Sequence, residues 1–265
     1  MMINSMQAAI IKKDIRAMVS NKRLFPVLLI VPLVFTVFLP TVFILSAYFV
    51  PDDLGDFQQL LDLMPVKNQH DTAARTVISL VLNSVIPAFF IMIPVMAASV
   101  MAASAFVGEK EKKTLETLLY CPLTLKQIFQ SKVWASFFLS MGVSFISFIV
   151  MQIVVQIEVL LTTGSMIPPD ITWLVALLLV SPAVSLLAIT LIVSGSAKAQ
   201  TMEESQQRSV FLILPVILLA AGQFSGLFLL NAWYMLALGA VFALLAYFLM
   251  KRAMVKFTYE TLLKH

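Results

Sequence analysis

Long apolar runs alternate with short polar segments along the whole of this 265-residue chain. A helix needs roughly 20 apolar residues to cross the ~30 Å hydrocarbon core of a bilayer. Six runs approach or exceed that length, at residues 27–50, 76–107, 133–157, 171–194, 210–230 and 233–250. The pattern therefore predicts an all-α polytopic membrane protein, with six transmembrane helices in a single domain that covers residues 1–265.

The second run and the last two depart from a plain membrane crossing. As one straight helix, residues 76–107 would extend about 48 Å, so we expect this span to tilt, to kink at Pro87 or Pro94, or to project into water. Only two residues separate the last two runs. Residues 222–232 therefore form either a plain hairpin or a re-entrant pair before the sixth span, and a re-entrant backbone must be covered by protein.

The composition supports lipid as the solvent for most of the chain. Hydrophobic residues make up 60% of it and charged residues 12%, whereas a soluble domain has ~45–50% apolar and ~25% charged residues. The single cysteine, Cys121, excludes an internal disulfide. The two histidines, His70 and His265, lie far apart in sequence, so we expect no metal site.

The positive charges indicate how the chain is oriented in the membrane. Sixteen of the eighteen lysine and arginine residues fall in residues 1–26, 108–132, 195–209 and the segment after residue 250. The alternate loops contain only Lys67 and Arg75. Because cytoplasmic loops carry the excess of positive charge, this distribution places both termini in the cytoplasm. Topology thus explains the net charge of +4, and we expect no nucleic-acid partner.

The N-terminal segment has the pattern of an amphipathic helix. At 100° per residue, four apolar residues cluster within about 80° of one another: Ala8, Ile11, Ile15 and Met18. Basic residues fall on the opposing arc: Lys12, Lys13, Arg16 and Arg23. This pattern predicts a helix in the inner membrane interface, attracted there by anionic lipid. The helix is either an anchor or a mechanical link between a cytoplasmic partner and the first span.

The cytoplasmic loop at residues 108–132 is the most polar segment between two spans, and it favours helix. Three leucines form an apolar ridge on it: Leu115, Leu118 and Leu119. Glutamates and lysines four residues apart support this helix, and Pro122 ends it. Thr124 and Gln127 then form a capping box that predicts the start of a new helix running into the third span. Without further information, a charged loop of this kind is usually only solvated.

The same segment resembles the signature of the type-2 ABC exporter permeases. In that family the loop after the second span has approximately the sequence E-K/R-E-x-G-T-L-E-x-L-L-x-x-P-[LV]-[ST]. The matching residues here are, in order, Glu109, Lys110, Glu111, Thr114, Leu115, Glu116, Leu118, Leu119, Pro122, Leu123 and Thr124. Lys113 stands where glycine is usual. The six spans, the cytoplasmic termini, the interfacial N-terminal helix and the region before the last span resemble the family as well.

The resemblance implies that the loop contains a coupling helix, which docks on an ATP-binding-cassette ATPase subunit. The partner-binding residues would be Glu109, Glu111, Thr114, Leu115, Glu116, Leu118, Leu119 and Pro122. ATP and Mg would be bound by that subunit, with no cofactor in this chain. Two copies of the chain, or this chain and a sibling, would form the full pathway. The resemblance also implies a multi-pass protein of the bacterial plasma membrane.

The chain itself does not carry the sequence of an ATPase. A P-loop needs G-x-x-x-x-G-K-[ST] so that its backbone amides can cradle phosphate. None of the eight glycines lies in such an arrangement. The chain is therefore predicted not to be an enzyme, and ATPase activity is expected only in complex with the ATP-binding subunit.

Two further groups of polar residues are candidates for function. In the second inner loop, residues 198–208 form either a solvated turn or a second partner contact through Glu203, Glu204 and Arg208. Within or next to the spans, polar side chains are costly and therefore informative. Five of them are candidates for lining a pathway, or alternatively for hydrogen bonds between helices: Asn83, Gln152, Gln156, Glu158 and Gln223.

The sequence therefore predicts the membrane-spanning permease subunit of an ABC exporter. An ATP-independent secondary transporter or channel is the first alternative, although ionisable residues at membrane depth are nearly absent. A membrane anchor or sensor that recruits a soluble partner is the second. Sodium, a peptide antibiotic, a lipid-like drug and a glycan all remain open as cargo, and the small exterior disfavours a long glycan.

Overall fold

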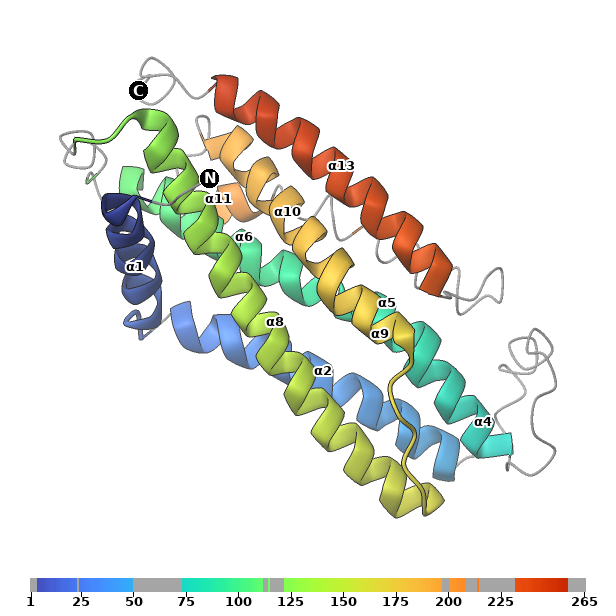
Figure 1. The fold of residues 1–265 in the computed structure, drawn as a ribbon. Coiled ribbons are helices and arrows are strands. Elements are labelled where there is room, and N and C mark those ends of the chain that lie inside the picture. Colours follow the sequence, from blue (N-terminus) through green and yellow to red (C-terminus); the bar gives the residue numbers. More distant parts are fainter. Residues whose placement is uncertain are drawn as a thin grey trace.

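The computed structural model describes residues 4–22, 24–49, 73–111, 114, 122–196, 201–207, 214 and 232–256. None of these residues lies in a strand, and the regular elements are all helices (Figure 1). In chain order they are α1 (Ser5–Val19), α2 (Leu24–Phe49), α4 (Ala73–Leu80), the π-helix η2 (Val81–Val85), α5 (Ile86–Phe90), α6 (Met92–Glu111), α8 (Leu125–Thr163), α9 (Ile171–Val175), the π-helix η3 (Ala176–Val180), α10 (Ser181–Ser196), α11 (Met202–Gln207) and α13 (Ala232–Lys256).

Five helical segments of the described chain are long and apolar enough to cross a membrane. They are Leu24–Ser46, Val77–Glu109, Leu125–Thr163, Ile171–Gly195 and Ala232–Met254. These segments confirm five of the six predicted runs as helices. The sixth, at residues 210–230, lies outside the described residues, as does most of the 222–232 region.

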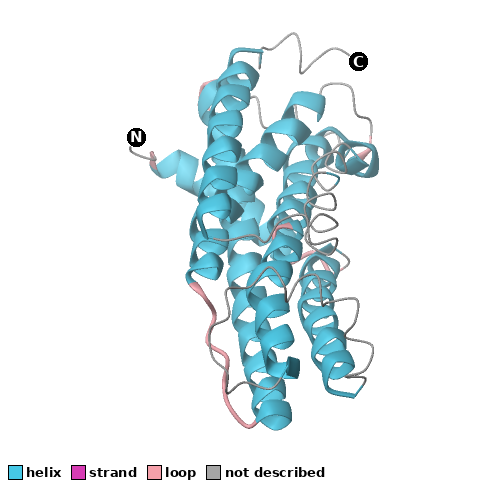
Figure 2. Cartoon of the chain, turned by 90° about the vertical axis from the view of Figure 1, so that its right-hand side faces the viewer, coloured by secondary structure: helices cyan, strands magenta, loops and turns pink. Residues whose placement is uncertain are grey.

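The long helices run side by side along one axis of an elongated bundle (Figure 2). The end of α6, the start of α8, α11 and the end of α13 lie at one end of this bundle, where α1 packs at an angle to its axis (Figure 1). The starts of α4 and α13 lie at the opposite end, with the end of α8 (Figure 1). The chain therefore leaves α11 at one end and enters α13 at the other.

Burial differs strongly between the spans and shows which of them form the centre. In the most apolar stretch of each span, 78% of the residues are buried in Val77–Glu109 and 67% in Ile171–Gly195. The corresponding shares are 28% for Leu24–Ser46 and 17% for Ala232–Met254. The second and fourth predicted spans therefore form the core of the bundle, while α2 and α13 leave wide apolar faces for lipid or another protein.

Helix α8 is much longer than the predicted span at residues 133–157. It contains 39 residues, or about 58 Å of helix. The predicted capping box is confirmed, because the Thr124 amide donates to Gln127 Oε1 at 2.9 Å and the Gln127 amide donates to Thr124 Oγ1 at 3.3 Å. At the other end, Gly164 adopts a left-handed conformation with φ of 72° and ends the helix.

Much of the predicted loop region at residues 108–132 is helical. Residues 108–111 continue α6, and residues 125–132 belong to α8, as the capping box at Thr124 predicts. The continuation has a local cause, since glutamate and lysine are good helix formers and no proline follows until Pro122. The stretch from 112 to 121, apart from Thr114, lies outside the described residues.

The second span is irregular at Pro87, one of the two positions at which a kink was a predicted alternative. A proline ring lacks an N–H and clashes with the carbonyl four residues earlier. Ahead of Pro87 the helix widens into η2, in which the Ile86 amide donates to the Val81 carbonyl five residues back. In this register the Leu82 carbonyl faces Pro87, which has no proton to give. Trp173 satisfies it instead, with Nε1 donating to the Leu82 oxygen at 3.1 Å.

The fourth span repeats this solution. Here η3 precedes Pro182, and the Ser181 amide donates to the Ala176 carbonyl five residues back. The Ser181 hydroxyl donates to the same oxygen at 2.9 Å. Both central spans therefore contain a wide turn directly before a proline, whereas α2 contains Pro32 and Pro40 within one continuous helix.

Close packing of α13 against η3 gives a first prediction. A Cβ atom at Gly239 would lie 2.8 Å from Leu179 Cδ2 and 2.9 Å from Leu179 Cγ. At Gly142, on α8, a Cβ atom would meet no described atom within 4 Å. We expect Gly239→Val to lower the melting temperature in detergent, since overpacking costs ~1–3 kcal/mol. Gly142→Val is the matched control, and equal melting temperatures for the two variants would contradict the close contact.

Candidate functional site

The N-terminal helix α1 packs onto the start of α8 and also contacts α2 and α6. Its buried residues recur every three or four positions: Gln7, Ile10, Asp14 and Met18. The predicted apolar face is thus only partly correct, because Ala8 is exposed and Ile11 and Ile15 are half-buried. The buried face is instead rotated towards the row that contains Asp14. The physical reason is that the Asp14 carboxylate pairs with Lys132 of α8.

Four charged side chains from three helices meet beside the loop between α6 and α8, and we call them the charge cluster: Lys13 and Asp14 of α1, Glu109 of α6 and Lys132 of α8. Lys13 Nζ lies 2.7 Å from Glu109 Oε1, and Lys132 Nζ lies 3.5 Å from Asp14 Oδ2. Two longer pairs close the cluster, Lys132 Nζ to Glu109 Oε1 at 3.7 Å and Lys13 Nζ to Asp14 Oδ1 at 3.9 Å. The formal charges of the cluster sum to zero.

Lys132 is the buried centre of the charge cluster. Its side chain is 3% exposed, and its ammonium group donates to the Ala105 carbonyl at 2.6 Å. The ammonium nitrogen also lies 5.9 Å from the centroid of the Phe106 ring. A buried ammonium group is tolerated only when its charge is compensated and its protons find acceptors. The α6 backbone and the two carboxylates provide these partners.

Asp14 is buried as deeply, with 4% of its side chain exposed. Burial raises the pKa of Asp14 above its ordinary value, while the neighbouring ammonium groups of Lys132 and Lys13 oppose that rise. The charged form of Asp14 therefore depends on Lys132. Without that cation, a proton on the carboxyl group becomes the less costly way to bury it.

The charge cluster lies at the first stem of the loop. The Thr114 amide donates to the Glu109 carbonyl at 2.9 Å, and the Thr114 hydroxyl donates to the Glu109 carboxylate. At the second stem, Leu123 packs against Ile10 of α1 and Ile128 of α8. Helix α1 therefore contacts both sides of the loop.

The structure separates the predicted partner-binding residues into groups. The Glu109 carboxylate is turned towards Lys13 and Lys132, with 13% of the side chain exposed. Glu111, Thr114 and Pro122 are exposed at the same end of the bundle. The other four, Leu115, Glu116, Leu118 and Leu119, lie outside the described residues.

The segment that contains α11 lies next to this region. Helix α11 packs against α6, and a Cβ atom at Gly108 would lie only 3.3 Å from Met202 Sδ. Glu203 and Glu204 are exposed on α11. Arg208, the third predicted residue of this contact, lies outside the described residues.

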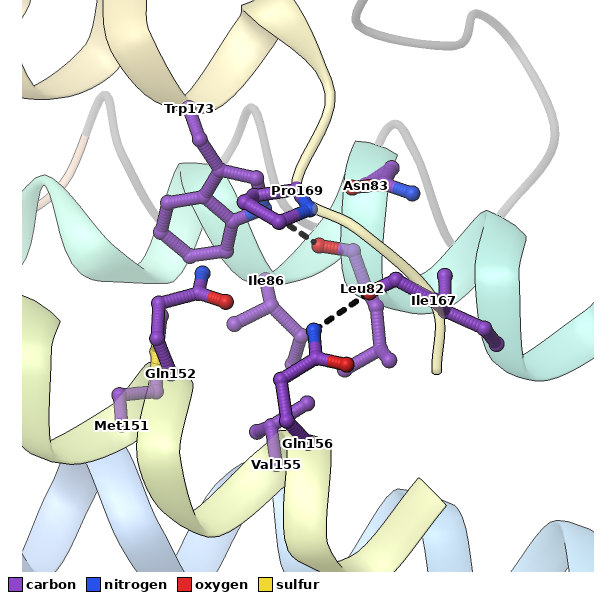
Figure 3. Close-up of a pocket in the computed structure, with 10 residues that line it drawn as sticks. All are labelled: Leu82, Asn83, Ile86, Met151, Gln152, Val155, Gln156, Ile167, Pro169 and Trp173. Atoms are coloured by element: carbon purple, nitrogen blue, oxygen red, sulfur yellow. Dashed lines mark hydrogen bonds between the residues drawn. The ribbon is translucent and has the colours of Figure 1, made fainter. Parts of the chain in front are cut away.

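At the opposite end of the bundle, three predicted pathway residues meet at one small cavity (Figure 3). Asn83, Gln152 and Gln156 line it together with Trp173 and other apolar side chains. Its volume of about 10 Å³ is room for roughly one water molecule. The cavity is therefore closed to any larger cargo in this conformation.

Hydrogen bonds to the segment between α8 and α9 hold this region together. Gln156 Nε2 donates to the Ile167 carbonyl (Figure 3), and the Asp170 amide donates to Asn83 Oδ1 at 3.1 Å. Glu158 does not line the cavity, because it faces α2 and accepts a hydrogen bond from Thr41 Oγ1 at 2.6 Å. Gln223 lies outside the described residues.

Sequence reasoning did not find the charge cluster as a unit. It placed Lys13 on the exposed basic arc of the N-terminal helix. It counted Lys132 only as one of the positive charges that indicate the orientation in the membrane. A signal was present, because Asp14 is the one acidic residue among the first 26. An isolated carboxylate within a basic amphipathic helix indicates a partner elsewhere in the chain.

Comparison with known proteins identifies a family. A family model described as ABC-2 family transporter protein matches residues 8–230. The match contains most of α1, both stems of the loop, α11 and the small cavity, and it ends before α13. No curated protein and no solved structure matches the chain significantly.

The charge cluster predicts a specific pattern of stability. Lys132→Met leaves the buried Asp14 carboxylate without its buried cation, while Glu109 keeps Lys13, and breaking a buried ion pair from one side costs about 3–5 kcal/mol. We expect a clear fall in the melting temperature of the purified protein. Lys132→Arg should retain most of the stability, and Lys12→Met, which removes an exposed charge from α1, should have little effect.

A double variant separates charge from packing. Asp14→Asn combined with Lys132→Met removes both members of the most buried pair, so it should be more stable than Lys132→Met alone. If the two single substitutions were simply additive in melting temperature, Asp14 and Lys132 would not interact energetically.

Proposed function

This chain belongs to the ABC-2 family of transporter proteins, and we propose that it is the membrane-spanning permease subunit of an ABC exporter. It is a multi-pass membrane protein by its apolar helices and its family. In the proposed reaction, a separate ATP-binding subunit hydrolyses ATP and this chain moves cargo outward. The orientation with both termini in the cytoplasm, drawn from the positive charges, is part of the proposal.

The observation that carries the proposal is the way the loop is held. Both of its stems are fixed to α1, the first through Lys13 and Glu109 and the second through Leu123 and Ile10. A loop that only joined two spans would not need a separate helix to support both of its sides. A surface that receives force from a partner does need such support. We therefore infer that residues 112–121 include the docking surface for the ATP-binding subunit.

The predicted contact residues take different roles in this proposal. Leu115, Glu116, Leu118 and Leu119 contact the ATP-binding subunit directly, and exposed Glu111, Thr114 and Pro122 flank them. Glu109 holds the stem instead of touching the partner, because its carboxylate is engaged by Lys13, Lys132 and Thr114. Exposed Glu203 and Glu204 on α11 form a second contact, together with Arg208.

The proposed energy coupling depends on a difference in the partner's affinity for two states of the permease. A ligand shifts a conformational equilibrium only when it binds one state more tightly than the other. The ATP-bound partner must therefore engage the outward-open state of the permease more tightly than the inward-open state. The loop stems belong to the helices of the second and third spans, so a displacement at the docking surface reaches the membrane directly.

The pathway is proposed to require a second permease, either another copy of this chain or a sibling. Asn83, Gln152, Gln156, Glu158 and Gln223 are proposed to line its outer part. The cavity bounded by Asn83, Gln152 and Gln156 is closed here, which suits a resting gate. Opening would transfer the hydrogen bonds of Asn83 and Gln156 from the 165–170 segment to water or cargo.

Co-purification tests the proposal. We expect the tagged chain, extracted gently from its native membrane, to retain an ATP-binding subunit in a fixed ratio. Leu118→Asp places a charge on the apolar ridge and should release that subunit. Leu161→Asp is the matched control, because Leu161 is 79% exposed near the opposite end of α8. The bound subunits can be identified and quantified by mass spectrometry.

The opposite result would favour a different class of protein. If the wild-type chain purifies without an ATP-binding subunit even after mild crosslinking, it works without ATP, as a secondary transporter or channel. If Leu118→Asp retains the subunit in full, the docking surface lies elsewhere on the cytoplasmic end.

A further inference from the structure

The charge cluster includes residues that lie outside the loop with the family signature. Two of its members, Lys13 and Asp14, belong to α1, and Lys132 lies eight positions after the end of the loop signature at Thr124. Lys13 already serves the proposed function by fixing the first stem through Glu109, but docking on residues 112–121 does not by itself need Asp14 or Lys132. Their burial and mutual distances therefore call for a separate explanation.

Lys132 joins three helices at one atom. Its Nζ donates to the Ala105 carbonyl of α6 at 2.6 Å, lies 3.7 Å from Glu109 Oε1 of α6 and lies 3.5 Å from Asp14 Oδ2 of α1. The side chain itself comes from α8. Separation of α1 from the other two helices would leave a buried carboxylate or a buried ammonium group without its partner, which a low-dielectric environment penalises strongly.

Helix α1 is also joined closely to the first span. The Ser20 amide donates to the Arg16 carbonyl at 2.9 Å, which closes the end of α1. The Leu24 amide then donates to Asn21 Oδ1 at 3.2 Å, at the start of α2. The turn between the helices is only a few residues long, so a movement of α1 displaces the cytoplasmic end of α2.

We propose that Lys132 is a positioning residue that makes α1 move as one body with the two stems of the cytoplasmic loop. The inference rests on the proposed function, since the force on the loop comes from an ATP-binding subunit. Through Lys132, a displacement of the loop reaches α2 as well as the helices of the second and third spans. The first span then moves with the loop without itself contacting the ATP-binding subunit.

A distance measurement across the cluster tests this. Spin labels are placed at Arg16 on α1 and Ile149 on α8, which are both exposed, after Cys121→Ser removes the single cysteine. Pulsed electron paramagnetic resonance is recorded on the complex with its ATP-binding subunit in lipid nanodiscs, without nucleotide and with ATP plus vanadate. We expect one narrow distance distribution that is the same in both states.

The variants decide whether Lys132 causes this rigidity. Lys132→Met should lose the single narrow peak, while Lys132→Arg should restore it and Lys12→Met should leave it unchanged. The subunit should remain bound in Lys132→Met and still hydrolyse ATP, because the docking surface is intact. If Lys132→Met does not fold, Asp14→Asn combined with Lys132→Met provides a neutral pair, and it should show the same loss.

Two results would overturn the inference, and they differ from failure of the proposed function. An unchanged narrow peak in Lys132→Met or in the double variant would show that packing alone holds α1. A wild-type distribution that shifts with nucleotide would show that α1 moves independently of α8. Absence of any ATP-binding subunit from the wild-type preparation concerns the proposed function instead, and the nucleotide-free distributions still show whether Lys132 fixes α1.

Discussion

In hydrocarbon, a backbone carbonyl that loses its helical donor must find another one, because no water is present to replace it. This constraint shapes the central spans. Pro87 and Pro182 each remove a donor, and the helix widens ahead of each of them. The indole of Trp173 supplies the missing hydrogen bond to Leu82 and thereby holds α9 against the second span. The small polar cavity lies where this bond and the hydrogen bonds of Asn83 and Gln156 bring the same segments together.

At the other end of the bundle, the helices are joined by ion pairs instead of by hydrogen bonds to free backbone carbonyls. Lys132 is buried because two carboxylates and a backbone carbonyl surround it, and each partner comes from α1 or α6. The N-terminal helix is consequently part of the packed structure and not only a group on the lipid surface. Lys12 and Arg16 remain exposed, so contact with anionic headgroups and attachment to α8 are compatible.

The spans and the start of α8 could be predicted from the sequence because their signals are local. Hydrophobic length indicates a span, and Thr124 with Gln127 indicates a helix start within four residues. The burial of Asp14 was not predictable in this way, since its partner Lys132 lies 118 positions along the chain. The buried face of α1 differs from the predicted one for the same reason. The ion pair between Asp14 and Lys132 outweighs the preference of the apolar residues. The continuation of α6 to Glu111 agrees with the helix favoured in the polar segment, because glutamate and lysine extend helices readily.

The length of α8 has a mechanical consequence. The helix runs without interruption through 39 residues, about 58 Å, from the loop stem to the opposite end of the bundle. The two central spans, in contrast, each contain a wide π-turn at which they can bend. A tilt of α8 by about 5° displaces its far tip by about 5 Å over that length. The uninterrupted helix therefore converts a small rotation at the loop into a displacement wider than a water molecule at the opposite end of the bundle.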